Sequence, residues 1–105
     1  METMEFEFSG GRPAPAHLPP ALVGVVASGN LEVLVEQASL GGSCRIDVRT
    51  PVSGFAGVWR SVLEDFHGRH AVGDIRVSIN DMGASPAVVT LRLDQALEDF
   101  LGEAG

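Results

Sequence analysis

The stretch LVGVVASGNLEVLVE, from Leu22 to Glu36, decides the fold, because two apolar arms flank one short polar turn. The first arm is a continuous apolar run, which favours a central strand that is covered on both faces. The second arm alternates apolar residues with glutamates, which is typical of a strand with one solvent-exposed face. Gly29 and Asn30 tolerate the positive φ angles that tight turns require. The sequence therefore predicts a β-hairpin whose turn holds the hydroxyl of Ser28 on a stiff, exposed support.

The size and charge of the chain limit what it can be. Its 105 residues, 45% of them hydrophobic, predict one globular domain over 1–105 with one modest core. The formal net charge is −7, from 14 acidic against 7 basic residues. This charge argues against nucleic acid or an anionic membrane as a partner, and it suits docking on basic protein surfaces.

The single cysteine and the N-terminal segment indicate a cellular location. Cys44 has no second cysteine to pair with, which is typical of a cytosolic protein. The opening METMEFEFSGG lacks the basic start and long apolar run of a signal peptide. No apolar run approaches the ~18 residues that span a bilayer. We expect a cytoplasmic protein without a membrane anchor.

Alternating apolar residues predict three further strands, over residues 4–8, 44–48 and 75–79. Residues 44–48 are expected to be a third hairpin arm that follows the Gly41-Gly42 turn, with Cys44 as an inert, buried thiol. Proline and glycine in SGGRPAPAHLPP predict a loop over residues 9–20.

A helical period replaces the alternation in two segments. The first stripe comprises Phe55, Val58, Trp59, Val62, Leu63 and Phe66, with Ser53 as N-cap and an end between Gly68 and Gly73. Ser85-Pro86 marks the start of the second helix, whose stripe comprises Val89, Leu93, Leu97, Phe100 and Leu101. Alternation within 86–92 also allows a strand, but the Ser-Pro start favours a helix. The expected fold is α/β (α+β): a two-layer, mostly antiparallel sheet of about five strands with two helices on one face.

Ser28 is the leading candidate site. A serine that receives a phosphate-linked cofactor needs an accessible hydroxyl and little side-chain bulk beside it, and Gly29 provides that access. It needs no neighbouring histidine or acid, because an attaching enzyme can supply the base. Ser28, Gly29 and Asn30 also suit an ordinary turn without a cofactor. A small hydrolase is a weaker alternative, since the segment is A-S-G-N rather than G-x-S-x-G and nothing pairs Ser28 with a histidine.

Other polar groups have structural explanations. His67 and His70 lie three residues apart and could share a metal with Cys44, but Gly68 between them indicates solvated histidines at a helix end. The segment from Asp81 to Ser85 joins a strand to a helix and could hold a phosphate, although capping is the simpler role. Trp59 is expected in the core.

The chain resembles the acyl carrier (delta) subunit of bacterial malonate decarboxylase. The resemblance runs from about Glu2 to Phe100 and is most specific in SGNLEVL and in INDMGASP followed by LRLDQALE. The chain resembles the citrate lyase acyl carrier subunit more distantly. The family's carrier serine lies in G-S-G-D-[L or M]-E-V-L, which matches Ser28. Ala27 stands where glycine is usual and Asn30 where aspartate is usual, and neither change removes the hydroxyl.

The resemblance implies that Ser28 carries 2'-(5''-phosphoribosyl)-3'-dephospho-CoA through a phosphodiester. It implies three partners: the malonate decarboxylase catalytic subunits, the acetyl-carrier:malonate acyltransferase subunit and a prosthetic-group transferase. The acyltransferase exchanges acetyl for malonyl on the thiol of the arm, and decarboxylation restores acetyl. The carrier itself would catalyse neither step.

The alternative is an unmodified structural or assembly subunit of a multienzyme complex, in which Ser28 is only a turn residue. Four surface residues are candidates for docking on partners: Glu32, Glu36, Asp81 and Arg92.

Overall fold

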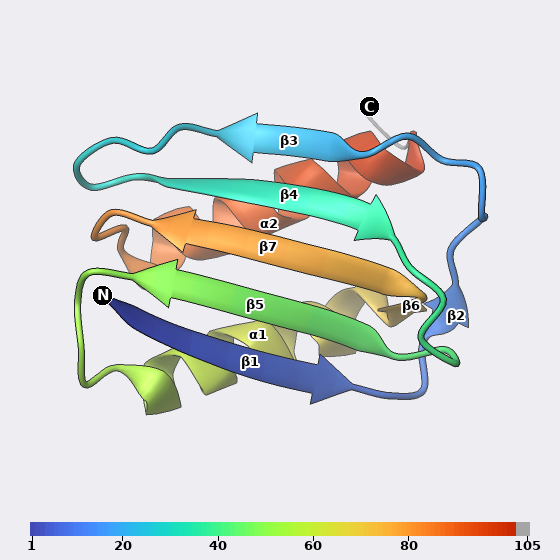
Figure 1. The fold of residues 1–105 in the computed structure, drawn as a ribbon, viewed down its shortest axis with the longest axis horizontal. Helices are drawn as coiled ribbons and strands as arrows, with labels where there is room; N and C mark the ends of the chain where they lie inside the picture. The colour runs from blue at the N-terminus through green and yellow to red at the C-terminus, as the bar shows by residue number, and fades with distance from the viewer. Residues whose placement is uncertain (103–105) are drawn as a thin grey trace.

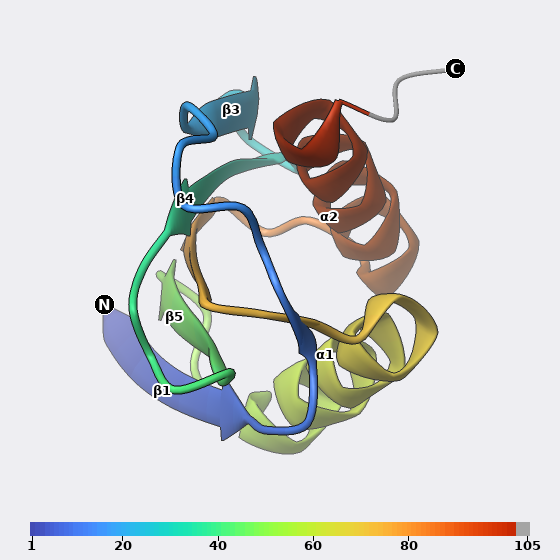
Figure 2. The ribbon, with the colours of Figure 1, turned by 90° about the vertical axis from the view of Figure 1, so that its right-hand side faces the viewer.

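A computed structural model, which describes residues 1–102, has one five-stranded sheet in the order β1-β5-β7-β4-β3 (Figure 1). These strands are β1 (Glu2–Phe8), β5 (Cys44–Thr50), β7 (Ile75–Asp81), β4 (Leu31–Gln37) and β3 (Ala21–Gly24). Every neighbouring pair is antiparallel except β5 and β7, which are parallel. The helices α1 (Ala56–His70) and α2 (Pro86–Leu101) both cover one face (Figure 2). The predicted two-layer α+β fold is confirmed.

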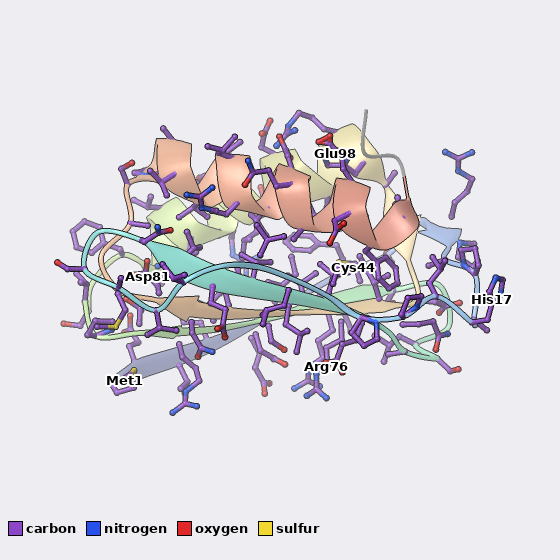
Figure 3. The ribbon with its side chains drawn as sticks, turned by 90° about the horizontal axis from the view of Figure 1, so that it is seen from above. Met1, His17, Cys44, Arg76, Asp81 and Glu98 are labelled. Carbon is purple, nitrogen blue, oxygen red and sulfur yellow. The ribbon has the colours of Figure 1, made fainter. Side chains whose placement is uncertain are left out.

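The alternating pattern sorts the strand residues between two faces. The face of β4, β5 and β7 that meets the helices is fully buried and comprises Leu31, Val33, Val35, Cys44, Ile46, Val48, Ile75, Val77 and Ile79. The other face carries charges: Asp47 pairs with Arg45 at 3.3 Å and with Arg76 at 3.2 Å. Figure 3 shows Arg76 pointing away from the helices.

Both helices bury most of the stripe that their period predicts; Val62 and Leu101 are half-buried, and the first turn of α1 is exposed. Trp59, Leu63 and Phe66 are buried in α1. In α2 the buried residues are Val89, Leu93, Ala96, Leu97 and Phe100. Residues 86–92 are helical, and the hydroxyl of Ser85 accepts a hydrogen bond from the Val88 N–H at 3.3 Å. The Ser85 N-cap and the choice of helix over strand are therefore confirmed.

The first arm of the hairpin differs from the prediction. β3 and β4 do pair as antiparallel neighbours, but β3 ends at Gly24 and lies at the edge of the sheet (Figure 1). Val25 and Val26 are 55% and 54% exposed, and they belong to the connecting loop. The central position was wrong because β7, which comes much later in the chain, occupies the other side of β4.

The strand β5 also has other neighbours than predicted. It pairs with β1 and, in parallel, with β7, and it is not a third arm beside β4. Parallel neighbours need a crossover connection, and α1 supplies it between β5 and β7. The turn at Gly41-Gly42 is held from a distance by Asp74, whose Oδ1 accepts from the Leu40 and Gly42 N–H groups at 3.1 and 2.8 Å.

Two smaller predictions need correction. The N-cap of α1 is Phe55, not Ser53, and no side chain caps this helix. Phe55 and Val58 are exposed although they belong to the predicted stripe, because the first turn of α1 lacks a covering layer. Within the predicted loop 9–20, the short β2 (Arg12–Pro13) pairs in parallel with β6 (Val72–Gly73).

Candidate functional site

Ser28 lies in the loop between β3 and β4, and it is exposed. The Asn30 N–H donates to the Ala27 carbonyl at 2.9 Å, which closes a tight turn around Ser28 and Gly29. Gly29 has φ +74, a left-handed conformation that glycine adopts without strain. An atom added at the Cβ position of Gly29 would meet open space, so the approach to the neighbouring hydroxyl is not obstructed from that side.

Hydrogen bonds brace this turn against the loop that follows β7. The Gly29 N–H donates to the Met82 carbonyl at 2.8 Å, and the Met82 N–H donates to the Asn30 carbonyl at 3.0 Å. These two bonds extend the β4–β7 pairing past the end of the sheet. Because backbone bonds hold the residues on both sides of the hydroxyl, the predicted stiff support has a physical basis.

Asn30 connects the turn to a helix. Its Oδ1 accepts from the Leu31 N–H at 2.8 Å and from Nε of Arg92 at 3.3 Å. Arg92 lies on α2, and its second contact is with Gln95 at 2.9 Å. The sequence suggested Asn30 as a turn residue and Arg92 as a docking residue, but it gave no sign that the two touch. They are 62 positions apart.

Gly24 is a structural requirement that the sequence reasoning missed. It has φ +90, and a Cβ at this position would clash with the Leu31 carbonyl oxygen. The chain therefore leaves β3 over the backbone of β4 with no space for a side chain. A glycine that interrupts an apolar run is the signal that could have revealed this close approach.

Two buried polar side chains lie beside the Ser28 turn. Oδ2 of Asp81 accepts from the Thr50 hydroxyl at 2.8 Å, and its Oδ1 accepts from the Ala84 N–H at 2.9 Å. Thr50 and Asp81 are the last residues of β5 and β7, so the pair ties the ends of the parallel strands together. Asp81 is buried and bonded, so it is not a free docking residue.

The other three candidate docking residues lie elsewhere than Asp81, on the outer face of the sheet or on α2. Glu32 accepts from the Asn80 amide at 3.3 Å on the face of the sheet away from the helices. Glu36 faces the same side, opposite Arg76 in the pairing of β4 with β7. Arg92 is half-buried and holds Asn30.

The histidines lie at the other end of the sheet. His67 stacks on Phe8, at the end of β1 that is remote from Thr50, and its Nε2 lies 3.1 Å from the Ser9 carbonyl. His70 is at the C-terminus of α1, and its Nε2 lies 2.9 Å from Oδ1 of Asp94. Figure 3 places His17 at the end opposite Asp81. A seven-residue strand spans about 20 Å, so none of these imidazoles can activate Ser28.

The next features are the buried cysteine and the groups that could hold a metal ion or cross a membrane. Cys44 is fully buried, and this burial raises the pKa of its thiol to about 12. Within residues 1–102, no three acidic, cysteine or histidine side chains gather closely enough to hold a metal ion. In the same range, neither helix is long and apolar enough to cross a membrane.

The fold and the site define a small α+β module that presents one serine on a braced, exposed turn. A sequence model of the family described as "Malonate decarboxylase delta subunit (MdcD)" matches residues 19–100. The malonate decarboxylase acyl carrier protein of Xanthomonas axonopodis pv. citri is 57% identical over 102 residues, which cover 97% of each chain. The protein of the same name from Burkholderia cepacia is 58% identical over 96 residues, covering 91% of this chain and 87% of that one.

A solved structure agrees with these sequence matches. A chain in the crystal structure of a Pseudomonas malonate decarboxylase hetero-tetramer in complex with malonate superposes with a TM-score of 0.85 at 41% identity. The match covers 95% of this chain and 99% of that one. The chain belongs to the malonate decarboxylase delta subunit family.

Proposed function

We propose that this chain is the acyl carrier subunit of a malonate decarboxylase, and that it carries acetyl and malonyl groups on a prosthetic group attached to Ser28. The observation that carries the proposal is the exposed Ser28 on a turn that backbone hydrogen bonds hold on both sides. Family membership and near-complete coverage by the named relatives support it. A carrier of this kind is not an enzyme: its residues hold and orient the arm, and its partners perform the chemistry.

The proposed group is 2'-(5''-phosphoribosyl)-3'-dephospho-CoA, joined to Oγ of Ser28 by a phosphodiester. When bound, it supplies a thiol that forms thioesters with acyl groups. The residues present fit such an anionic group. The α1 and α2 helices both begin at the Ser28 end of the sheet, and neither has an acidic residue in its first turn. Helix N-termini favour negative charge, and the guanidinium of Arg92 lies against the same turn.

The proposed partners follow from this role. They are the decarboxylase catalytic subunits, the acetyl-carrier:malonate acyltransferase subunit and the transferase that attaches the group, and the proposed location is the cytoplasm. Tethering makes delivery of the thioester effectively intramolecular, at concentrations of order millimolar for a short flexible link. The arm then provides the reach, and the braced turn fixes the point from which it swings.

Intact-mass measurement after co-expression with the attaching enzymes tests the proposal. We expect an adduct of the mass of the prosthetic group on the wild-type chain and none on Ser28→Ala. The matched control is Ser53→Ala, which removes another exposed serine at the same end of the molecule and should keep the adduct. An unmodified wild-type chain would instead identify an assembly subunit without a cofactor, and an adduct that survives in Ser28→Ala would place the attachment elsewhere.

A further inference from the structure

A cavity of about 330 Å³ opens between the first turns of α1 and α2, at the Ser28 end of the sheet. Two polar residues, Thr50 and Asp81, belong to its lining, and Phe55, Trp59, Ala84 and Val89 are among its apolar lining residues. Such a volume is at the lower limit of small-molecule sites, so it suits one ring system and not a long chain. Phe55 and Val58 are exposed because their side chains line this open cavity and are not packed in the core.

The lining selects a class of ligand. Two aromatic side chains, Phe55 and Trp59, offer surfaces on which a flat ring can pack. The Asp81 carboxylate uses its oxygens for two hydrogen bonds, and a carboxylate has about four acceptor positions. It can therefore accept from one more N–H donor, while it repels phosphates and carboxylates. The cavity suits an uncharged, flat ring with an amino group.

The Ser28 turn is joined directly to the rim of this cavity. Gly29 and Asn30 are hydrogen-bonded to Met82, and the next two residues, Gly83 and Ala84, line the cavity. From standard Cα spacings, the Cα of Ser28 lies within about 13 Å of the Cα of Gly83. A group attached to Ser28 can thus reach the cavity across a single loop.

We propose that the cavity holds the adenine ring of the group attached to Ser28, with the adenine amino group donating to the Asp81 carboxylate. This inference rests on the proposed function. Adenine is a flat, uncharged ring with an amino donor, and one ribosyl unit separates its nucleoside from the phosphodiester. The thiol lies at the far end of a long flexible chain, and a cavity of this volume has no space for that chain. Seating the base fixes the direction in which the rest of the arm leaves the protein, which reduces the conformational entropy lost when a partner captures it.

Nuclear magnetic resonance of the loaded chain tests this inference, with intact mass confirming that the group is attached. Trp59 is the only tryptophan, so its indole N–H signal and its fluorescence report on the cavity without ambiguity. We expect loading to shift the signals of Trp59, Gly83 and Ala84, and we expect nuclear Overhauser contacts between adenine ring protons and Trp59.

A pair of variants separates filling of the cavity from general effects. Val58→Phe replaces a small side chain in the cavity lining with an aromatic ring. Leu91→Phe also introduces an aromatic ring, but at an exposed position on α2 outside the lining. Both should be loaded, but loading should no longer shift Trp59 in Val58→Phe and should still shift it in Leu91→Phe. A fully loaded wild-type chain with unchanged Trp59 signals, or with contacts from the pantetheine methyl groups instead, would overturn the inference and leave the proposed function intact. Absence of the adduct would overturn both.

Discussion

Cys44 is a titratable residue in surroundings very different from water. Its side chain is fully buried on the helix-facing side of β5, and burial raises the pKa of the thiol to about 12. The thiolate is the reactive form, so this cysteine is inert in the folded protein near neutral pH. The chain has no tyrosine and no lysine, since all seven of its basic residues other than histidine are arginine. Cys44 is therefore the only side chain expected to titrate between pH 9 and 12.

This isolation gives a clear pH dependence. The thiol of the unfolded chain loses its proton near pH 9, while the folded chain keeps it up to about pH 12. In that window the folded state binds more protons, so the free energy of unfolding falls as pH rises, by about 1.4 kcal/mol per pH unit. Below pH 9 both states are protonated and the group has no effect on the pH dependence.

Urea unfolding at several pH values from 8 to 11 measures the slope. The control is Cys44→Ala, which removes the titrating group and should give a flat profile from a lower starting stability. A wild-type free energy of unfolding that is constant from pH 9 to 11 would show that the thiol is not held in the protonated state.

At the scale of the element, the β3–β4 connection depends on two glycines with different constraints. Gly24 has φ +90 and lies against the Leu31 carbonyl, whereas Gly29 has φ +74 with open space around its Cβ position. Gly29→Ala should cost only the backbone strain, about 1–2 kcal/mol. Gly24→Ala adds a steric clash with backbone that cannot move without breaking the pairing of β3 with β4, so we expect a total of about 3 kcal/mol or more.

Denaturant unfolding of the two variants, which differ only in position, measures this difference. Equal losses would contradict the close approach of β3 to β4. A protein with Gly24→Ala that fails to fold at all would still agree with it, provided that Gly29→Ala folds.

The same element shows what the sequence could predict and what it could not. Alternation identifies which face of a strand is buried, and it placed Leu31, Val33 and Val35 correctly. It carries no information about which strand lies beside which, so β3 was expected at the centre and β5 beside β4. Helical periodicity likewise predicted the stripe of α1 correctly from Trp59 onward. It could not show that Phe55 and Val58 border a cavity, because that depends on where the loop after β7 passes.

The candidate site also has one part that the sequence predicts and one part that it does not. Ser28 and Gly29 were identified from local turn chemistry and from resemblance, and their exposure and conformation agree with a turn. The partners that brace this turn are Met82 and Arg92, both more than 50 positions away. Contacts at such sequence separation follow from the arrangement of β4, β7 and α2 and leave no local pattern.

At the scale of the whole molecule, the two helices contact each other through a small interface on one side of the sheet (Figure 2). Near the C-terminus of α1 a salt bridge connects the two helices. Arg69 donates to both carboxylate oxygens of Asp94 on α2 at 3.0 Å, and His70 lies 2.9 Å from the same group. Arg69 also pairs with Asp65 of its own helix at 2.9 Å. The cavity lies at the other end of α1, so this ion pair joins the helices where the cavity does not separate them.

Asp94→Asn removes the link between the helices, whereas Asp65→Asn removes a pair within one helix. Pairs as exposed as these contribute little singly, about 0.3–0.5 kcal/mol for the intrahelical pair. The contact of Asp94, to which Nη1 of Arg69 donates at both carboxylate oxygens and which His70 shares, should contribute somewhat more. We expect about 1 kcal/mol at low ionic strength, because this contact joins two helices that otherwise share only a small interface. Salt screens both contributions, so urea unfolding in 20 mM and in 1 M salt should show the difference between the variants at low salt and its disappearance at high salt. If Asp94→Asn cost no more than Asp65→Asn at low salt, the helices would be positioned by their packing on the sheet alone, and the width of the cavity would be set entirely by the side chains of the core.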